Sequence, residues 1–283
     1  MSRKALSVTV TTVILALAIL ILSSASAYLA ANIFEIQNQQ TEFNQAKEVS
    51  VYLAQAIEDV AFRRGTSAYV RFNIRSSKPS FISNWGLITV TVNDVNEFWA
   101  PIENVELGTV MVGGGSYAST SSIEPLRGFG RLTDSWREDS LIVCESTSPL
   151  VWVYSEQRDG AKIWIDPARI RVSYLGVLNC SWGMVGGRPR FQLANVVEVK
   201  LITLKYGGGI SGTILNLKVI CKDITVKQIN FNSGLITVKA YLSIGNDNYE
   251  GEVFIPDYYN IDPALPTIVT VIVSEVEVYM LGG

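Results

Sequence analysis

The sequence contains no histidine, although it is 283 residues long. Without an imidazole the chain cannot form a Ser-His-Asp or Cys-His pair or a His-Glu-x-x-His zinc helix, which excludes most common hydrolase mechanisms. A carboxylate pair of the glycosidase type remains compatible with the 26 acidic residues, but sequence spacing cannot locate one. We therefore expect no enzyme: no catalytic residues, no metal site and no cofactor.

Charged residues are also scarce. They make up 17% of the chain, against roughly 25% in typical soluble domains. The net charge is only −3, so we expect no nucleic-acid partner. Hydrophobic residues reach 48%, which excludes a disordered chain and suffices for one large domain or two modest ones.

Charges are rarest near the N-terminus. Arg3 and Lys4 precede an uncharged stretch over 5–34, whose first part, 5–22, contains only Ala, Leu, Ile, Val, Ser and Thr. As a helix this first part spans about 27 Å, close to the ~30 Å hydrocarbon core of a bilayer. Basic residues before the span and an acidic remainder after it match the positive-inside rule. We therefore expect a membrane-inserted precursor whose remainder is exported.

Glycine and proline, the strongest helix breakers, are absent before Gly65. At average frequencies, a segment of this length would hold about eight of them. Beyond the uncharged stretch, apolar residues recur at three- and four-residue steps, with an interruption at Gln40. The pattern predicts one helix over 6–64, which is apolar all round over 6–34 and amphipathic over 35–64.

The first residues are compatible with two forms of processing. Lys4-Ala5-Leu6-Ser7 stands before the apolar run, so cleavage after Ala5 removes a leader of residues 1–5 and keeps the apolar helix. Ala25-Ser26-Ala27 instead fits an ordinary secretory signal that is cut after Ala27. An ordinary signal peptide has no reason to continue without a break into a long amphipathic helix. The pattern therefore favours the short leader.

The start of the chain resembles the class III signal peptide of archaeal type IV pilins and archaellins. It has a basic residue, then a small residue, and then a Leu that begins an unbroken apolar helix. In such subunits the apolar half of the helix is stored in the membrane and later packs with copies of itself. The amphipathic half lies against the head domain. The resemblance covers residues 3–64. Many bacterial type IV pilins have an acidic residue near the mature N-terminus, whereas none occurs here before Glu35, so the likeness is to the archaeal pattern.

The resemblance implies a structural subunit of an extracellular adhesion filament at the cell surface. Its partners would be copies of itself, the membrane before assembly, a prepilin peptidase with the pilus assembly machinery, and a surface or host cell. The processing residues would be Lys4, Ala5, Leu6 and Ser7, and the assembly positions would be Leu6, Val10, Val13, Ile14, Leu17, Leu20 and Ile21. The sequence does not separate adhesion from motility. A competing interpretation is a single-pass membrane-anchored extracellular β-domain that binds a ligand or acts as a carboxylate-type hydrolase.

From Gly65 onward the hydrophobic period changes from helical to two, as in Leu87–Val92. Many short strands without a second helical pattern predict a mostly antiparallel β-sandwich head over 65–283, with an insertion over 95–160. The predicted fold class is therefore α+β, with an N-terminal helix of about 60 residues followed by the sandwich.

Turn residues and one apolar segment predict details of the head. Asn232-Ser233-Gly234 and Gly245-Asn246-Asp247-Asn248 each predict a hairpin. The segment 267–280 is nearly continuous in apolar residues, which favours a central strand beside the long helix. Loop 113–131, rich in Gly and Ser, is a candidate adhesive or subunit-contact surface. Six Trp residues suggest a sugar-stacking surface, but Trp152 and Trp164 lie in strand patterns typical of the core.

Cys144, Cys180 and Cys221 are an odd number of cysteines. Outside the cell they allow one disulfide and one buried thiol, with three pairings open. Asn179-Cys180-Ser181 is the single N-x-S/T sequence and permits glycosylation if Asn179 is exposed.

Overall fold

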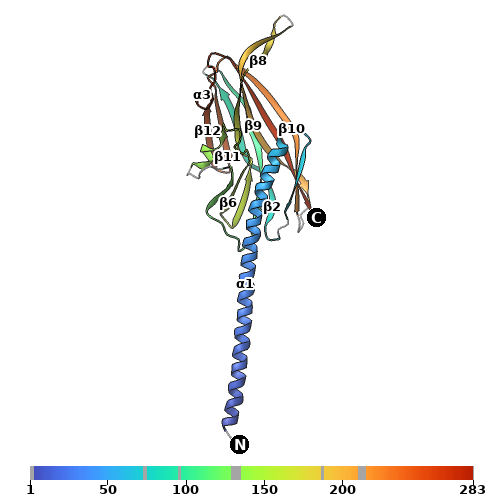
Figure 1. The fold of residues 1–283 in the computed structure, drawn as a ribbon, viewed down its shortest axis with the longest axis vertical. Helices are drawn as coiled ribbons and strands as arrows, with labels where there is room; N and C mark the ends of the chain where they lie inside the picture. The colour runs from blue at the N-terminus through green and yellow to red at the C-terminus, as the bar shows by residue number, and fades with distance from the viewer. Residues whose placement is uncertain are drawn as a thin grey trace.

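The computed structural model describes residues 3–72, 75–94, 97–128, 135–185, 188–209 and 215–282. It consists of one long helix, α1 (Arg3–Ala61), and a β-rich head at the C-terminal end of that helix (Figure 1). The predicted α+β class and the unbroken N-terminal helix are confirmed.

Two sheets form the head. The first contains β1 (Ser67–Phe72), β5 (Ile142–Val143), β8 (Ile170–Val185), β9 (Arg188–Gly209), β10 (Leu215–Phe231) and β13 (Thr267–Gly282). The second contains β2 (Lys78–Asn93), β3 (Phe98–Gly113), β4 (Ile123–Arg127), β6 (Trp152–Gln157), β7 (Ala161–Asp166), β11 (Thr237–Ile244) and β12 (Asp247–Phe254). Two short helices, α2 (Trp136–Asp139) and α3 (Ile255–Tyr258), complete the described elements.

Among the described residues, the strand order is β1-β10-β13-β9-β8-β5 in the first sheet and β12-β11-β2-β3-β7-β6-β4 in the second. Most neighbours are antiparallel, while β13 pairs with β9, and β5 with β8, in parallel. The central position of β13 confirms the interpretation of segment 267–280. Within 95–160, where we predicted an insertion, β3, β4 and β6 belong to the second sheet and β5 to the first.

One of the two predicted hairpins is present. β11 and β12 are joined through Gly245, whose φ of 59° suits the first central position of a II′ turn. The hairpin predicted at 232–234 is wrong, because β10 lies in the first sheet and β11 in the second. Phe231 and Ile236, at the two ends of the crossing, are fully buried, whereas Asn232 and Leu235 between them are exposed, so the chain passes from one sheet to the other near the surface instead of folding back.

The head has two clusters of buried side chains. In one, inward residues of the two sheets pack directly on each other, as Val90 and Leu107 do with Val199 and Leu201. In the other, the C-terminal part of α1 packs against strands of both sheets and separates them. Phe43 is the largest helix side chain in this cluster and is fully buried, which contributes about 1.5–3 kcal/mol of hydrophobic stabilisation. The helix is therefore part of the core of the head.

Candidate assembly helix and its seat in the head

The N-terminal part of α1, residues 3–38, which we call the shaft, projects from the head (Figure 1). Every residue from Val10 to Asn38 is exposed. The predicted assembly positions Val10, Val13, Ile14, Leu17, Leu20 and Ile21 are exposed by 51–65%. Lys4, Ala5, Leu6 and Ser7 lie in the helical backbone, and their side chains fall outside the described part of the chain.

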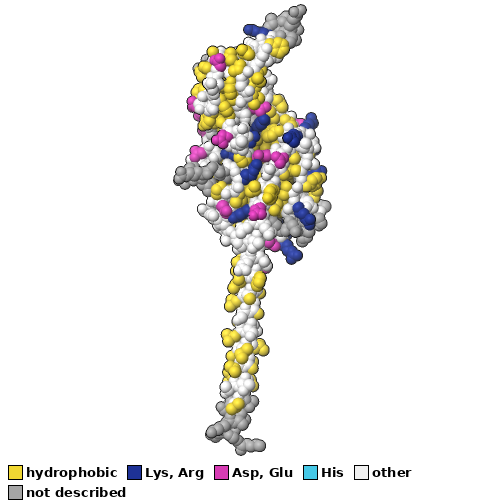
Figure 2. Space-filling view, viewed as in Figure 1, with side chains coloured by type: hydrophobic (Ala, Val, Ile, Leu, Met, Phe, Trp, Pro, Cys, Tyr) yellow, Lys and Arg dark blue, Asp and Glu magenta, His cyan; other side chains and the backbone are white. Residues whose placement is uncertain are grey.

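Figure 2 shows apolar side chains along the visible face of the shaft, and the sequence has no charged residue from Val10 to Phe34. The shaft includes an 18-residue window with a mean hydropathy of 2.3, no part of which is buried in the protein. By length and composition this helix is able to cross a membrane. At ~1.5 Å per residue the shaft extends for about 50 Å, of which a bilayer core covers ~30 Å. So much exposed apolar surface is not stable in water, and it requires a lipid or protein environment.

The remainder of α1, from Gln39 to Ala61, is held by the head, and we call it the seat. Phe43, Ala46, Leu53 and Ile57 face inward and are fully buried, whereas Tyr52 on the opposite side is 64% exposed. The amphipathic pattern of the sequence therefore corresponds to one buried and one exposed side of this part of the helix. The shielded part begins a few residues after Glu35, because the loops of the head reach only as far as Gln39.

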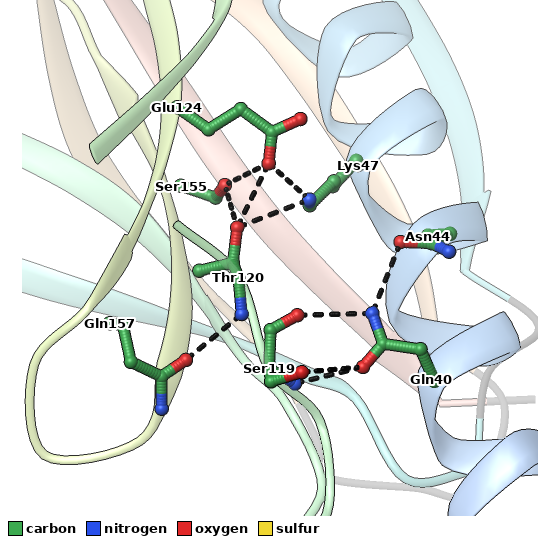
Figure 3. A network of polar contacts seen from close by, with 8 residues as sticks. All are labelled: Gln40, Asn44, Lys47, Ser119, Thr120, Glu124, Ser155 and Gln157. Carbon is green, nitrogen blue, oxygen red and sulfur yellow. Dashed lines mark hydrogen bonds and ion pairs between the residues drawn. The ribbon is translucent and has the colours of Figure 1, made fainter. Parts of the chain in front are cut away.

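Loop 114–122, which we call the collar, binds the seat at its N-terminal end (Figure 3). The Gln40 Nε2 donates to the Ser119 carbonyl at 3.0 Å, and the Ser119 amide donates to the Gln40 Oε1 at 2.9 Å. The Tyr117 amide donates to the Gln39 Oε1 at 3.0 Å. These contacts explain why the apolar stripe is interrupted at Gln40. They also show that this part of the predicted adhesive loop is engaged with the helix.

Glycine allows the collar to approach the helix closely. A Cβ at Gly114 would lie 2.8 Å from the Phe43 ring, and one at Gly115 would lie 2.4 Å from the Gln39 Oε1. Real Cβ atoms do not approach other atoms so closely. Gly114 and Gly115 of the glycine-rich sequence therefore serve the packing of the helix, whereas a Cβ at Gly113 would meet no atom within 4 Å.

An ion pair extends the collar toward the second sheet (Figure 3). The Lys47 Nζ donates to the Glu124 Oε2 at 2.5 Å and to the Thr120 Oγ1 at 3.2 Å. The Thr120 hydroxyl donates to the same Glu124 oxygen at 2.9 Å, and the hydroxyls of Thr120 and Ser155 lie 2.8 Å apart. The hydrogen bond from Lys47 lowers the pKa of Glu124, and the hydrogen bond from the Ser76 hydroxyl lowers the pKa of Glu42 in the same way.

These carboxylates predict an acid-sensitive junction between seat and head. A carboxylate whose pKa is lowered on folding stabilises the fold above its unfolded pKa, ~4.3 for Glu, and loses that contribution as the pH falls through the folded pKa. We expect Glu124→Gln to lower the melting temperature by about 2 °C at pH 6 and to flatten its decline below pH ~4.3. The effect is small because the Glu124 side chain is 37% exposed, which limits the pair to under about 1 kcal/mol.

Thermal denaturation followed by circular dichroism between pH 3 and 7 checks this expectation. Glu103→Gln is the matched control, because Glu103 is an exposed carboxylate on β3 of the same sheet. Identical pH profiles for the wild type and Glu124→Gln would contradict the prediction.

A second ion pair fixes the C-terminal part of the seat. The Arg127 guanidinium donates to both carboxylate oxygens of Glu58, at 2.7 and 3.0 Å, and the Val151 amide donates to Glu58 at 2.7 Å. Each charged side chain is only 17% exposed. Bidentate pairs of this kind fix orientation as well as distance. The direction of the shaft is therefore set by the head at two points along the helix.

All three cysteines are free thiols, so the predicted disulfide does not form in this structure. They lie on separate elements: Cys144 follows β5, Cys180 lies on β8 and Cys221 on β10. None faces another in the strand register. Cys221 is buried, and its Sγ donates to the Ala61 carbonyl at 3.0 Å, which caps the end of α1.

Asn179 is exposed on β8, so its sequon is accessible.

A buried ion pair on the outer face of the second sheet is a feature that the sequence did not reveal. The Arg137 guanidinium donates to the Asp166 Oδ2 at 2.6 Å and to the Tyr154 hydroxyl at 2.9 Å. Burial is the largest single influence on Arg137 and lowers its pKa, but the attraction of Asp166, Tyr154 and Tyr249 and the hydrogen bond to Asp166 together outweigh burial and raise the pKa. The guanidinium lies 4.6–5.7 Å from five ring centroids, those of Trp85, Trp136, Trp152, Tyr154 and Tyr249. We call this arrangement the arginine box.

The arginine box contains three of the six tryptophans, Trp85, Trp136 and Trp152. Trp152 is fully buried, as its strand pattern predicts, and Trp164 is half-buried against Trp85. Beside the box lies a groove of about 580 Å³ lined in part by Tyr241, Tyr249, Glu138 and Glu250. Two rings and two carboxylates make this groove the best candidate for a small-ligand site on the head.

Among the described residues, no group of three or more Cys, Asp or Glu side chains is placed to hold a metal ion. No protein family, no curated protein and no solved structure matches the chain. The functional argument therefore rests on the physical chemistry of the chain itself.

Proposed function

We propose that the chain is a membrane-stored structural subunit that polymerises through the shaft into an extracellular filament of the archaeal type IV pilin class. One observation carries the proposal: a single unbroken helix joins a fully exposed apolar shaft to a seat that is fixed inside the head. A flexible stalk would suffice to anchor a domain. A helix of fixed direction is what repeated packing of identical subunits requires.

Transfer of the shaft from lipid to a helix bundle gains little hydrophobic free energy, because lipid tails are as apolar as Leu. Close packing must therefore drive assembly. Thr12 and Ala16, and further along Ala27 and Ala31, are small residues spaced four apart that let helices approach closely. Arg3 and Lys4 would be costly charges within such a bundle, and cleavage after Ala5 would remove them.

Mass spectrometry of the mature N-terminus, with electron microscopy of the cell surface, tests this function. A chain that begins at Leu6 and is found in filaments supports the proposal. A chain that begins at Tyr28 has lost the shaft and contradicts it. A chain that begins at Met1 and forms no filaments supports a membrane anchor.

The groove beside the arginine box favours a second candidate, an anchored extracellular domain that binds a ligand between Tyr241 and Tyr249. Such a protein would be monomeric in detergent and would keep its N-terminal charges. Light scattering of the purified full chain distinguishes this form from an assembling subunit.

A further inference from the structure

A two-stranded ribbon, residues 176–185 of β8 and 188–194 of β9, extends beyond the rest of the first sheet, and we call it the arm. It lies at the opposite end of the molecule from the N-terminus of α1 (Figure 1). β13 begins to pair with β9 only at Asn195, and β5 pairs with β8 only at Ile170 and Arg171. Within the described residues the arm therefore has two open edges over about 30 Å.

The arm is apolar on both faces. Asn179 faces Leu193 and Ser181 faces Phe191 across the ribbon, so that these side chains share one face, while Leu178 lies on the other. The exposed fractions are 59% for Phe191, 55% for Leu193 and 47% for Leu178. A two-stranded ribbon without further packing is marginally stable in water, and open apolar edges tend to pair with another chain. The arm thus has the properties of an interaction surface.

The charge of the arm indicates its partner. Residues 172–197 contain two arginines, Arg188 and Arg190, and no acidic residue. Arg190 is exposed on the arm. The same chain has an acidic groove of about 410 Å³ between α2 and β12, lined by Glu138, Asp139, Glu250 and Glu252. Glu252 is paired with Lys239, and Glu138 and Glu250 contribute further negative charge to the groove.

The acidic groove resembles the arm in that both combine charged and apolar surface. Tyr258 lines it and is 59% exposed, so apolar surface lies beside the carboxylates, as Phe191 lies beside Arg190 on the arm. The arm points away from its own head and cannot reach its own groove (Figure 1). It also lies at the opposite end of the molecule from the N-terminus of α1, away from the membrane that the shaft would cross (Figure 1).

We propose that the arm of one subunit docks in the acidic groove of a second copy of this chain and so links neighbouring heads. This inference rests on the proposed function, because polymerisation through the shaft brings the heads together. Apolar contacts of Phe191 and Leu193 would supply affinity, and Arg190 would set the orientation.

Photo-crosslinking in cells that produce the full chain tests the docking. A photoreactive phenylalanine analogue at position 191 is expected to give crosslinked dimers whose peptides map to 138–142 or 247–258. The same analogue at Phe98, which is 69% exposed on β3, is the matched control and should give none. Arg190→Glu is expected to reduce the dimer about fivefold, and Glu250→Arg in that background should restore it.

Absence of dimers from position 191, equal yields from positions 191 and 98, or a glycan on Asn179 in every copy would overturn the docking. Filaments that form normally without such crosslinks would refute the arm contact and leave the proposed function standing. Chains that form no filaments but still give the 191 dimer would refute the proposed function and support the contact.

Discussion

Replacing Leu17 with Asp is expected to abolish filaments while leaving the chain in the membrane. Leu17 lies in the middle of the apolar run and is 55% exposed on the shaft. An acid at the centre of a span costs about 2.5–3.5 kcal/mol of insertion free energy. The surrounding window has a mean hydropathy of 2.3, so the remaining residues still favour insertion.

Assembly should be affected far more than insertion. In the membrane, local thinning and water defects reduce the cost of the carboxylate, whereas in a bundle of shafts every subunit would hold it in a fixed, dry position without a partner, which costs several kcal/mol. Because 1.4 kcal/mol corresponds to a tenfold change in an association constant, polymerisation should weaken on the order of a thousandfold. The carboxylates of neighbouring copies would also repel one another. Filament counts by electron microscopy, with the amount of subunit in the membrane fraction, measure the two effects separately.

Leu17→Met is the matched control for this variant, because it preserves size and apolar character. It should assemble as the wild type does. Normal filament numbers from Leu17→Asp would mean that this part of the shaft is not buried between subunits, and the proposed mode of polymerisation would then fail.

Arg137→Met is expected to lower the free energy of unfolding by about 3–5 kcal/mol, the largest stability loss that we predict for a single change. The variant leaves the Asp166 carboxylate, which is fully buried, without its cation. It also removes the guanidinium from the centre of the arginine box, where it contacts five rings. Urea unfolding of the full chain in detergent, followed by tryptophan fluorescence, measures the loss.

Two further variants make this prediction specific. Lys239→Met breaks the more exposed pair with Glu252, at 3.0 Å, and should leave the urea midpoint nearly unchanged. Arg137→Met combined with Asp166→Leu removes both buried charges and should recover most of the loss, because replacing a whole buried ion pair with apolar residues is often neutral. A loss below 1 kcal/mol for Arg137→Met alone would show that the pair does not stabilise the head.

The helix was predictable because its signals are local. The absence of Gly and Pro before Gly65 and the three- and four-residue spacing of apolar residues depend only on neighbouring positions in the chain. The interruption at Gln40 was visible but had no explanation in the sequence. Its partner, Ser119, is 79 residues away.

The sheet order and the polar contacts of the head were not predictable from local patterns. Asn232-Ser233-Gly234 looks like a hairpin turn, yet the strands on either side of it belong to different sheets. Turn residues specify a change in the direction of the chain. Which strand the following segment pairs with depends instead on which apolar faces are buried together. For the same reason no local pattern marks Arg137, which lies in a polar segment and is buried only when Trp85 and Trp152 converge on it from other strands.

The sequence by itself determined that the chain has one long helix with an apolar and an amphipathic half, a β-rich remainder, and no histidine chemistry. Only the tertiary structure decided which part of that helix the head binds and which charges are buried in pairs. It also decided that the ends of β8 and β9 that form the arm have no further strand beside them. The physical reason is that periodicity is a property of adjacent residues. Burial and strand pairing are properties of residues that only the complete fold brings together.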